Sequence, residues 1–292
     1  MVDNGTIKCY TQSMSVVRWN YKMKIETVEL NALYKIPTDE KCTLTAYWFE
    51  GNAEKKAEPL PALLIIPGGG YAFVSEREGE PLALEFYNRR YVTFVLRYNV
   101  APAVRHPIPL LQAACAVDYI RHNAEKFHVN GKVFAMGFSA GGHLAGTLAD
   151  FWHSVPYEGV LARKPDAKID GVALCYAVLS ADKGVAHEGS FSNLLGKPYD
   201  PADKDMQALS IEKHVSDKNP PAFFWHTAAD DGVPVANTLL TAAAYARLKI
   251  PFEVHVYPYG GHGASLCDER VNSVNERAAV WVDECDKFFK AL

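Results

Sequence analysis

A serine flanked by glycines gives the strongest chemical signal in this sequence. Ser139 lies at the centre of the run GFSAG, residues 137–141, which fits a G-x-S-x-G pattern. An apolar run at 133–136 precedes it, and a helix-favouring run at 142–149 follows it. This context predicts a sharp turn between a strand and a helix, which lifts the serine oxygen out of the sheet. We therefore predict that Ser139 is a nucleophile.

A serine hydroxyl is a weak nucleophile, so it needs a base and a third group that orients the base. Asp230 follows one predicted strand, and His262 lies among glycines after the next predicted strand, residues 252–257. The order serine, carboxylate, histidine is the one that this strand-turn-helix arrangement uses. We expect Ser139, Asp230 and His262 to meet along one edge of a sheet.

A glycine-rich loop supplies the groups that an acyl-transfer site needs for its oxyanion. The run PGGGY, residues 67–71, comes directly after the apolar run 62–66. Glycines let backbone N–H groups turn toward a developing negative charge without interference from a Cβ atom. We predict an oxyanion hole formed by the N–H of Ala140 and that of Gly69 or Gly70, and the choice between the two glycines stays open.

A mostly parallel sheet with helices on both faces is the fold that positions these residues, since predicted strands and helices alternate along the chain. Two β-rich segments, 24–36 and 42–49, predict antiparallel strands at an N-terminal edge. The predicted strands that follow are 62–66, 91–97, 132–136, 169–177, 222–226 and 252–257. The predicted helices are 80–90, 108–127, 141–151, 234–248 and 274–289.

One long segment interrupts this alternation. Residues 180–219 are rich in Gly, Pro, Asp and Lys and are too long for an ordinary connection. Because the segment follows the predicted strand 169–177, it would overhang the edge where the strands end. We expect residues 1–292 to form a single domain, with a lid-like insertion at about 180–219.

The composition argues against several classes of protein. The 292 residues are 49% hydrophobic and 22% charged, and 30 Lys and Arg stand against 34 Asp and Glu. This balance lacks the basic excess of a nucleic-acid binder, and no run reaches the roughly 18 apolar residues of a membrane span.

The first residues show no signal-peptide pattern, and the six cysteines lack metal-ligand spacing. We expect a cytoplasmic protein with reduced thiols that binds neither nucleic acid nor a membrane.

These motifs resemble those of the α/β-hydrolase superfamily. The runs PGGGY at 67–71 and GFSAGGHLA at 137–145 are most similar to its bacterial acetyl-xylan-esterase and feruloyl-esterase-like (BD-FAE-like) branch. The resemblance extends from about Cys42 to the C-terminus. Many lipases and esterases have His-Gly-Gly-Gly where this chain has Pro67 before its glycines, which argues against the hormone-sensitive-lipase type.

The resemblance implies a serine esterase that needs no metal and no cofactor. In this family the acid stands four residues before the proline of a Val-Pro pair, here Pro234, so Asp230 rather than Asp231 is the implied acid. The implied substrate is a small acyl ester, above all an acetyl group on a sugar or xylo-oligosaccharide. The alternatives are an arylformamidase-type hydrolase, a general short-chain esterase and a catalytically silent binding module of the same fold.

Side chains near these loops are candidates for contacts with the substrate. Tyr71 and Phe73 follow the glycines and suit stacking, although packing in the core is an equal alternative for each. Asn193 lies in the insertion and is expected to face the pocket, whereas His226 is expected to be structural or to line the site. The oligomeric state stays open, with a homodimer as one alternative.

Overall fold

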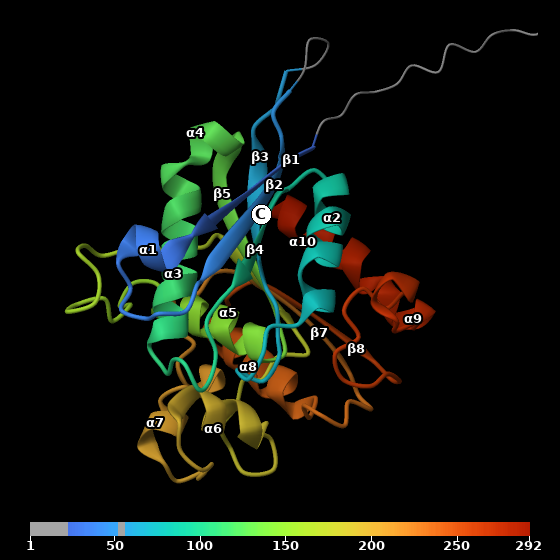
Figure 1. Cartoon of the computed structure of the whole chain (residues 1–292). Coiled ribbons are helices and arrows are strands. Elements are labelled where there is room, and N and C mark those ends of the chain that lie inside the picture. Colours follow the sequence, from blue (N-terminus) through green and yellow to red (C-terminus); the bar gives the residue numbers. More distant parts are fainter. Residues whose placement is uncertain (1–22, 52–55) are drawn as a thin grey trace, which may run out of the picture.

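An eight-stranded sheet runs through the protein (Figure 1). The computed structural model describes residues 23–51 and 56–292 of the chain. The spatial order of the strands is β1-β2-β4-β3-β5-β6-β7-β8. β1 and β4 both pair antiparallel with β2, and the other neighbouring pairs are parallel. The strands are β1 (Met23–Glu29), β2 (Thr43–Phe49), β3 (Leu60–Ile66), β4 (Val92–Arg97), β5 (Val129–Phe138), β6 (Gly171–Cys175), β7 (Ala222–Thr227) and β8 (Phe252–Tyr257).

Helices cover both faces of this sheet. The helices α3 (Ile108–His122), α5 (Ala140–Phe151) and α8 (Ala236–Leu248) pack on one face and contribute to one hydrophobic cluster. The helices α2 (Glu80–Asn88) and α10 (Trp281–Ala291) contribute to a second cluster on the other face. The predicted fold class, a mostly parallel sheet between two layers of helices, is therefore confirmed.

The buried strand β3 explains why an unbroken apolar run predicted a strand of this kind. Leu64 and Ile66 belong to one hydrophobic cluster, whereas Leu63 and Ile65 belong to the other. Successive side chains of a strand point to opposite faces, so a strand covered on both sides must be apolar at every position.

The antiparallel N-terminal edge is confirmed, but the predicted first strand is too long. β1 ends at Glu29, and the short helix α1 (Leu30–Tyr34) follows it. The two carboxylate oxygens of Glu29 accept hydrogen bonds from the N–H groups of Asn31 and Ala32. This cap starts a helix at a place where the β-rich composition predicted that the strand continues.

Two predicted helices are each divided in the structure. The predicted helix 108–127 ends as α3 at His122 and resumes as α4 (Ala124–Phe127), because the Asn123 side chain bonds back to the carbonyl of Tyr119. The predicted helix 274–289 begins later, as α9 (Glu276–Ala279), and continues as α10. The strand expected at 132–136 extends in both directions as β5.

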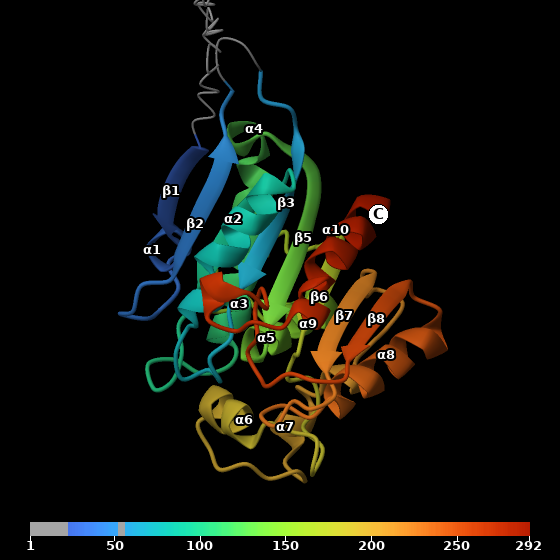
Figure 2. The same cartoon turned by 90° about the vertical axis from the view of Figure 1, so that its right-hand side faces the viewer.

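The strand order places the candidate site at one edge of the sheet. β3 lies beside β5, so the glycine loop that follows β3 and the serine turn that follows β5 are neighbours. The carboxyl ends of β7 and β8, which lead to Asp230 and His262, lie at the same edge. The insertion 180–219 contains α6 (Glu188–Leu195) and α7 (Lys204–Gln207), which lie below the carboxyl ends of the strands in Figure 2.

Two predictions from the composition concern the chain as a whole. In the described ranges, no helix is long and apolar enough to cross a membrane. The five cysteines there are buried free thiols, and Cys9 lies outside the described residues. The N-terminal residues 1–22, on which the signal-peptide prediction depends, also lie outside them.

Candidate active site

A strained turn between β5 and α5 presents Ser139. Its φ and ψ angles are 53° and −118°, outside the usual regions for a residue with a side chain. The turn is also pressed against its neighbours: a Cβ on Gly137 would lie 2.3 Å from the carbonyl oxygen of Gly141, and a Cβ on Gly141 would lie 2.2 Å from that of Ile66. The two glycines of the G-x-S-x-G pattern are therefore required by close backbone contacts.

The structure brings Ser139, His262 and Asp230 into one hydrogen-bonded row. The distance between Ser139 Oγ and His262 Nε2 is 2.8 Å, and that between His262 Nδ1 and Asp230 Oδ2 is also 2.8 Å. A carboxylate only accepts, so Nδ1 carries the ring proton and Nε2 is left to accept from the serine hydroxyl. In this tautomer His262 is arranged to remove the proton of Ser139.

The carboxylate of Asp230 is held in place from several sides. Its Oδ1 accepts from the N–H groups of Gly232 and Val233 at 2.9 and 2.8 Å, and its Oδ2 lies 3.2 Å from His226 Nε2. Burial by itself raises the pKa of Asp230, but hydrogen bonds from His226 and His262 outweigh it and hold that pKa well below its usual range. Asp230 is therefore an anion at neutral pH, whereas the neighbouring Asp231 is exposed.

His226 has a role in this row that the sequence reasoning only partly anticipated. It is fully buried, and its Nδ1 lies 2.9 Å from Thr238 Oγ1. Its Nε2 lies 2.9 Å from the carbonyl oxygen of Val233 and close to Asp230, and since both groups only accept, Nε2 carries a proton. His226 is thus a structural residue that orients Asp230. Its place at the end of a predicted strand is the signal in the sequence that pointed to it.

Three backbone N–H groups in the loops next to Ser139 have no acceptor among the described residues. Ala140 is the first residue of α5, so its N–H has no partner within the helix. In the described part of the chain, the N–H groups of Gly69 and Gly70 also donate to no other group. By contrast, Gly68 N–H donates to Glu78 at 2.9 Å. Gly69, Gly70 and Ala140 therefore remain available to an oxyanion.

Two buried residues that the sequence reasoning missed connect the loops of the site. Glu78 is 3% exposed, and its second carboxylate oxygen accepts from the hydroxyl of Tyr176 at 2.6 Å. The same hydroxyl accepts from the N–H of Ser265 at 2.9 Å, and the Tyr176 ring packs edge-on against His262. Burial and the nearby carboxylate raise the pKa of Tyr176 well above its ordinary value, so it stays a neutral donor. No local motif marked these contacts, because Glu78 and Tyr176 are far apart in sequence.

An open cleft of about 740 Å³ adjoins Ser139 and His262. Phe73 and Asn193 line it, so their contacts with a substrate stay predictions, and the Asn193 side chain also donates to the carbonyl oxygen of Gly70 at 2.9 Å. Tyr71 does not line it. The Tyr71 side chain is 1% exposed, and its hydroxyl lies 2.8 Å from His143 Nδ1 in the core. Of the two alternatives predicted for Tyr71, stacking on a substrate and packing in the core, the structure shows packing in the core.

His187, at the start of α6, adds a fixed donor to this cleft. Its Nδ1 accepts from the N–H of Ser190 at 3.2 Å, so the ring proton is on Nε2. Burial and the nearby His262 hold the pKa of His187 below its usual value. His187 therefore stays neutral at neutral pH and offers one N–H from the insertion.

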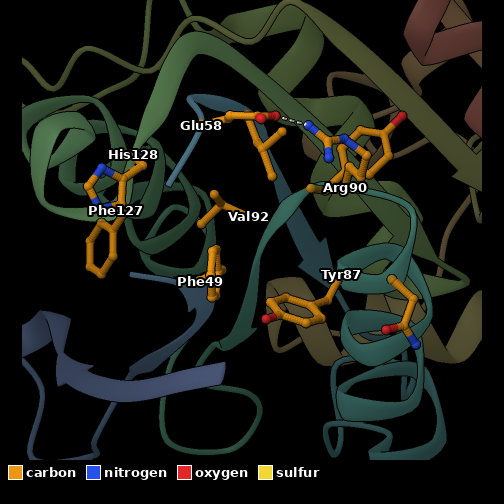
Figure 3. Close-up of a pocket in the computed structure, with 10 residues that line it drawn as sticks. Phe49, Glu58, Tyr87, Arg90, Val92, Phe127 and His128 are labelled. Atoms are coloured by element: carbon orange, nitrogen blue, oxygen red, sulfur yellow. Dashed lines mark hydrogen bonds and ion pairs between the residues drawn. The ribbon is translucent and has the colours of Figure 1, made fainter. Parts of the chain in front are cut away.

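A second cavity, of about 440 Å³, lies at the opposite edge of the sheet, where β3 and β4 begin. Figure 3 shows its aromatic lining and the ion pair between Glu58 and Arg90, at 2.5 Å. It contains none of the residues that the sequence marked as chemical. The row of Ser139, His262 and Asp230 therefore identifies the cleft at the carboxyl edge as the candidate active site.

Comparison with known proteins agrees with this fold. The BD-FAE family model matches residues 51–244. The chain is 39% identical to endo-1,4-beta-xylanase B of Butyrivibrio fibrisolvens over 211 residues, 71% of this chain and 33% of that protein. It is 31% identical to the acetylxylan esterase of Xylanibacter ruminicola over 206 residues, 69% of this chain and 40% of that protein. The chain thus spans between a third and two fifths of these curated relatives.

A solved structure extends the similarity to nearly the whole chain. The acetyl ester-xyloside bifunctional hydrolase of Caldicellulosiruptor lactoaceticus is 33% identical and superposes with a TM-score of 0.80. The match covers 91% of this chain and 96% of that one. With the family match and the sheet topology, it confirms the resemblance drawn from the glycine and serine motifs. The chain belongs to the BD-FAE family of α/β-hydrolase enzymes.

Proposed function

We propose that the chain is a serine carboxylesterase whose catalytic residues are Ser139, His262 and Asp230. The observation that carries this proposal is the continuous row from Ser139 Oγ through His262 to Asp230, with both distances at 2.8 Å. The unused N–H groups of Gly69, Gly70 and Ala140 beside Ser139 add the oxyanion hole that ester hydrolysis needs.

The proposed reaction proceeds in two halves. Ser139 Oγ attacks the acyl carbonyl carbon while His262 Nε2 takes the serine proton, and Asp230 stabilises the imidazolium that forms. The backbone N–H groups bind the oxyanion of the tetrahedral intermediate. His262 then gives its proton to the leaving alcohol. Water attacks the acyl-enzyme with His262 again acting as the base, and the acid product leaves.

The proposed substrate is a small acyl ester, most specifically an acetyl group on a sugar or xylo-oligosaccharide. The names of the acetylxylan esterase and of the acetyl ester-xyloside hydrolase support this proposal. His187 and Asn193 are polar side chains in the lining of the cleft, and they can form hydrogen bonds with the hydroxyl groups of a sugar. The cytoplasmic location and the homodimer stay predictions of the sequence.

The residues 180–219 fit the proposal as a lid-like insertion in a single domain. His187 and Asn193, both from this segment, line the cleft that contains Ser139. The hydrogen bond from Asn193 to Gly70 joins the insertion to the glycine loop. A substrate in the cleft would therefore contact the insertion as well as the catalytic residues.

The experiment that tests the proposal measures acetate release from 4-nitrophenyl acetate and from acetylated xylo-oligosaccharides. We expect Ser139→Ala and His262→Ala each to lower kcat by about 10³-fold or more while the thermal unfolding midpoint changes little. The exposed Ser154 gives a matched control, since Ser154→Ala should keep its activity. Full activity in Ser139→Ala would disprove the mechanism. Hydrolysis of an aryl formamide but of neither ester would favour the formamidase alternative.

A further inference from the structure

One cation in the cleft has no carboxylate partner in the part of the chain that the structure describes. Arg77 is exposed and is the single lysine or arginine among the described residues that line the cleft. Its guanidinium forms no ion pair or hydrogen bond with any other described side chain. An arginine in a substrate cleft with all its N–H donors unused is suited to bind an anionic part of a ligand.

The position of Arg77 places its guanidinium on the side of the site where the alcohol leaves in the proposed reaction. A Cβ placed on Gly263 would lie 2.5 Å from Arg77 Nη2, so the guanidinium packs against the residue that follows His262. The Arg77 backbone is also tied to this loop, because its carbonyl oxygen accepts from Ser265 Oγ at 2.6 Å. His262 gives its proton to the leaving alcohol, so the alcohol part of the substrate lies on this side of the site.

The acidic residues beside Arg77 are already engaged. Glu76 pairs with Arg97. Glu78 is turned into the protein, where its oxygens accept from Gly68 N–H and from the hydroxyl of Tyr176. The charge of Arg77 is therefore not cancelled by a direct contact with either neighbour in the sequence.

We propose that Arg77 binds a carboxylate on the alcohol part of the ester. This inference rests on the proposed function and narrows its substrate class to acyl esters of hydroxy acids, acidic sugars included. Guanidinium and carboxylate groups match in a two-point hydrogen-bonded geometry that an ammonium group cannot reproduce. The acyl group of the substrate takes no part in this contact with Arg77.

A pair of aryl acetates that differ in one charge tests the assignment. The anionic ester is 4-acetoxybenzoate, and the neutral one is its methyl ester. The quantity to compare is the ratio of their kcat/KM values in the intact protein and in Arg77→Gln, because the difference in intrinsic reactivity cancels between variants. We expect the ratio of anionic to neutral ester to fall about tenfold in Arg77→Gln, mainly through KM. Arg77→Lys should recover part of the loss.

A matched control and a binding measurement complete the test. Arg90→Gln removes an arginine at the opposite edge of the sheet and should leave the ratio unchanged. In the intact protein, the product 4-hydroxybenzoate should inhibit competitively at a lower concentration than its methyl ester. This comparison uses no variant, so it does not depend on whether Arg77→Gln folds.

Two outcomes would overturn the carboxylate subsite and can be told apart. An unchanged ratio in Arg77→Gln, together with equal inhibition by the two products, would reject the subsite while Ser139-dependent hydrolysis leaves the proposed function intact. Turnover of both esters that persists in Ser139→Ala would reject the proposed function, and the subsite with it.

Discussion

At the scale of single residues, the contacts of Asp230 decide which carboxylate orients His262. Asp230→Asn keeps the size of the side chain but removes the charge that stabilises a protonated His262, and it permits the wrong tautomer of the ring. We expect kcat to fall by about 10³- to 10⁴-fold. The exposed neighbour gives the control, because Asp231→Asn should change kcat by less than about threefold. Steady-state kinetics on 4-nitrophenyl acetate distinguishes them, and the reverse order would move the acid by one residue.

The sequence predicted the residues whose signals are local. Ser139 lies in a motif with its own strand and helix, and Asp230 and His262 follow predicted strands, so their places at the ends of parallel strands were enough to predict that they meet. The packing role of Tyr71 could not be predicted in this way, since it depends on His143, which is 72 positions away. Glu78 was missed for the same reason.

At the scale of elements, the contacts of Glu78 connect three loops around Ser139. The carboxylate holds the glycine loop through Gly68 N–H, and Tyr176 carries the contact to the N–H of Ser265, three residues after His262. We therefore infer that Glu78 and Tyr176 are positioning residues, which hold the glycine loop and the loop of His262 in place.

This connection predicts that substitutions at the two positions are not independent. Glu78→Gln and Tyr176→Phe should each lower kcat about tenfold with little change in KM, since both disturb one chain of hydrogen bonds. The double variant should lose much less than the hundredfold expected of independent sites. Kinetics on all four proteins measures this coupling, and additive losses would contradict it. Glu78→Ala should be worse than Glu78→Gln, because Gln can still accept from Gly68 N–H.

The elements themselves were predicted where the pattern of apolar residues is set by burial. The run 62–66 is apolar at every position because β3 is covered on both faces, and the alternation that follows it gave the remaining parallel strands. The errors lie where a single side chain changes the backbone. Glu29 caps a helix inside the predicted first strand, and Asn123 divides the predicted helix 108–127. Such side-chain hydrogen bonds have little effect on the periodicity of apolar residues, so the apolar pattern does not reveal them.

At the scale of the whole molecule, a buried acid makes stability depend on pH. Asp150 on α5 is 2% exposed, and one of its oxygens has no partner among the described residues. Burial raises the pKa of Asp150 to about 8, with a further contribution from the nearby Glu212. The unfolded chain loses this proton near pH 4, whereas the folded chain keeps it up to about pH 8. The contribution of Asp150 to stability is therefore lost as pH rises through this window.

Removing the charge should remove this dependence. We expect Asp150→Asn to raise the free energy of unfolding at pH 8 by about 2 kcal/mol relative to the intact protein, and by much less at pH 4. Urea unfolding at the two pH values measures the difference, with the exposed Asp231→Asn as the control. An equal change at both pH values would show that the carboxyl group of Asp150 does not titrate in this way.

The sheet as a whole brings residues that are up to 193 positions apart, Gly69 and His262, into one site. Gly69 follows β3, Ser139 follows β5, Asp230 follows β7 and His262 follows β8, and the parallel pairing brings these strand ends to a common edge. Each turn supplies one group of the proposed reaction, and α6 supplies the wall opposite them. The central claim of this account is that Ser139 is the nucleophile.

Covalent labelling with diethyl 4-nitrophenyl phosphate tests that claim most directly, since this compound phosphorylates an activated serine and leaves it blocked. Intact-protein mass measurement and peptide mapping should find one diethylphosphoryl group per chain, on Ser139, and esterase activity should fall in proportion to labelling. The Ser139→Ala protein should take up none. Labelling of a different residue in step with the loss of activity, or an active enzyme that carries the label on Ser139, would contradict the account.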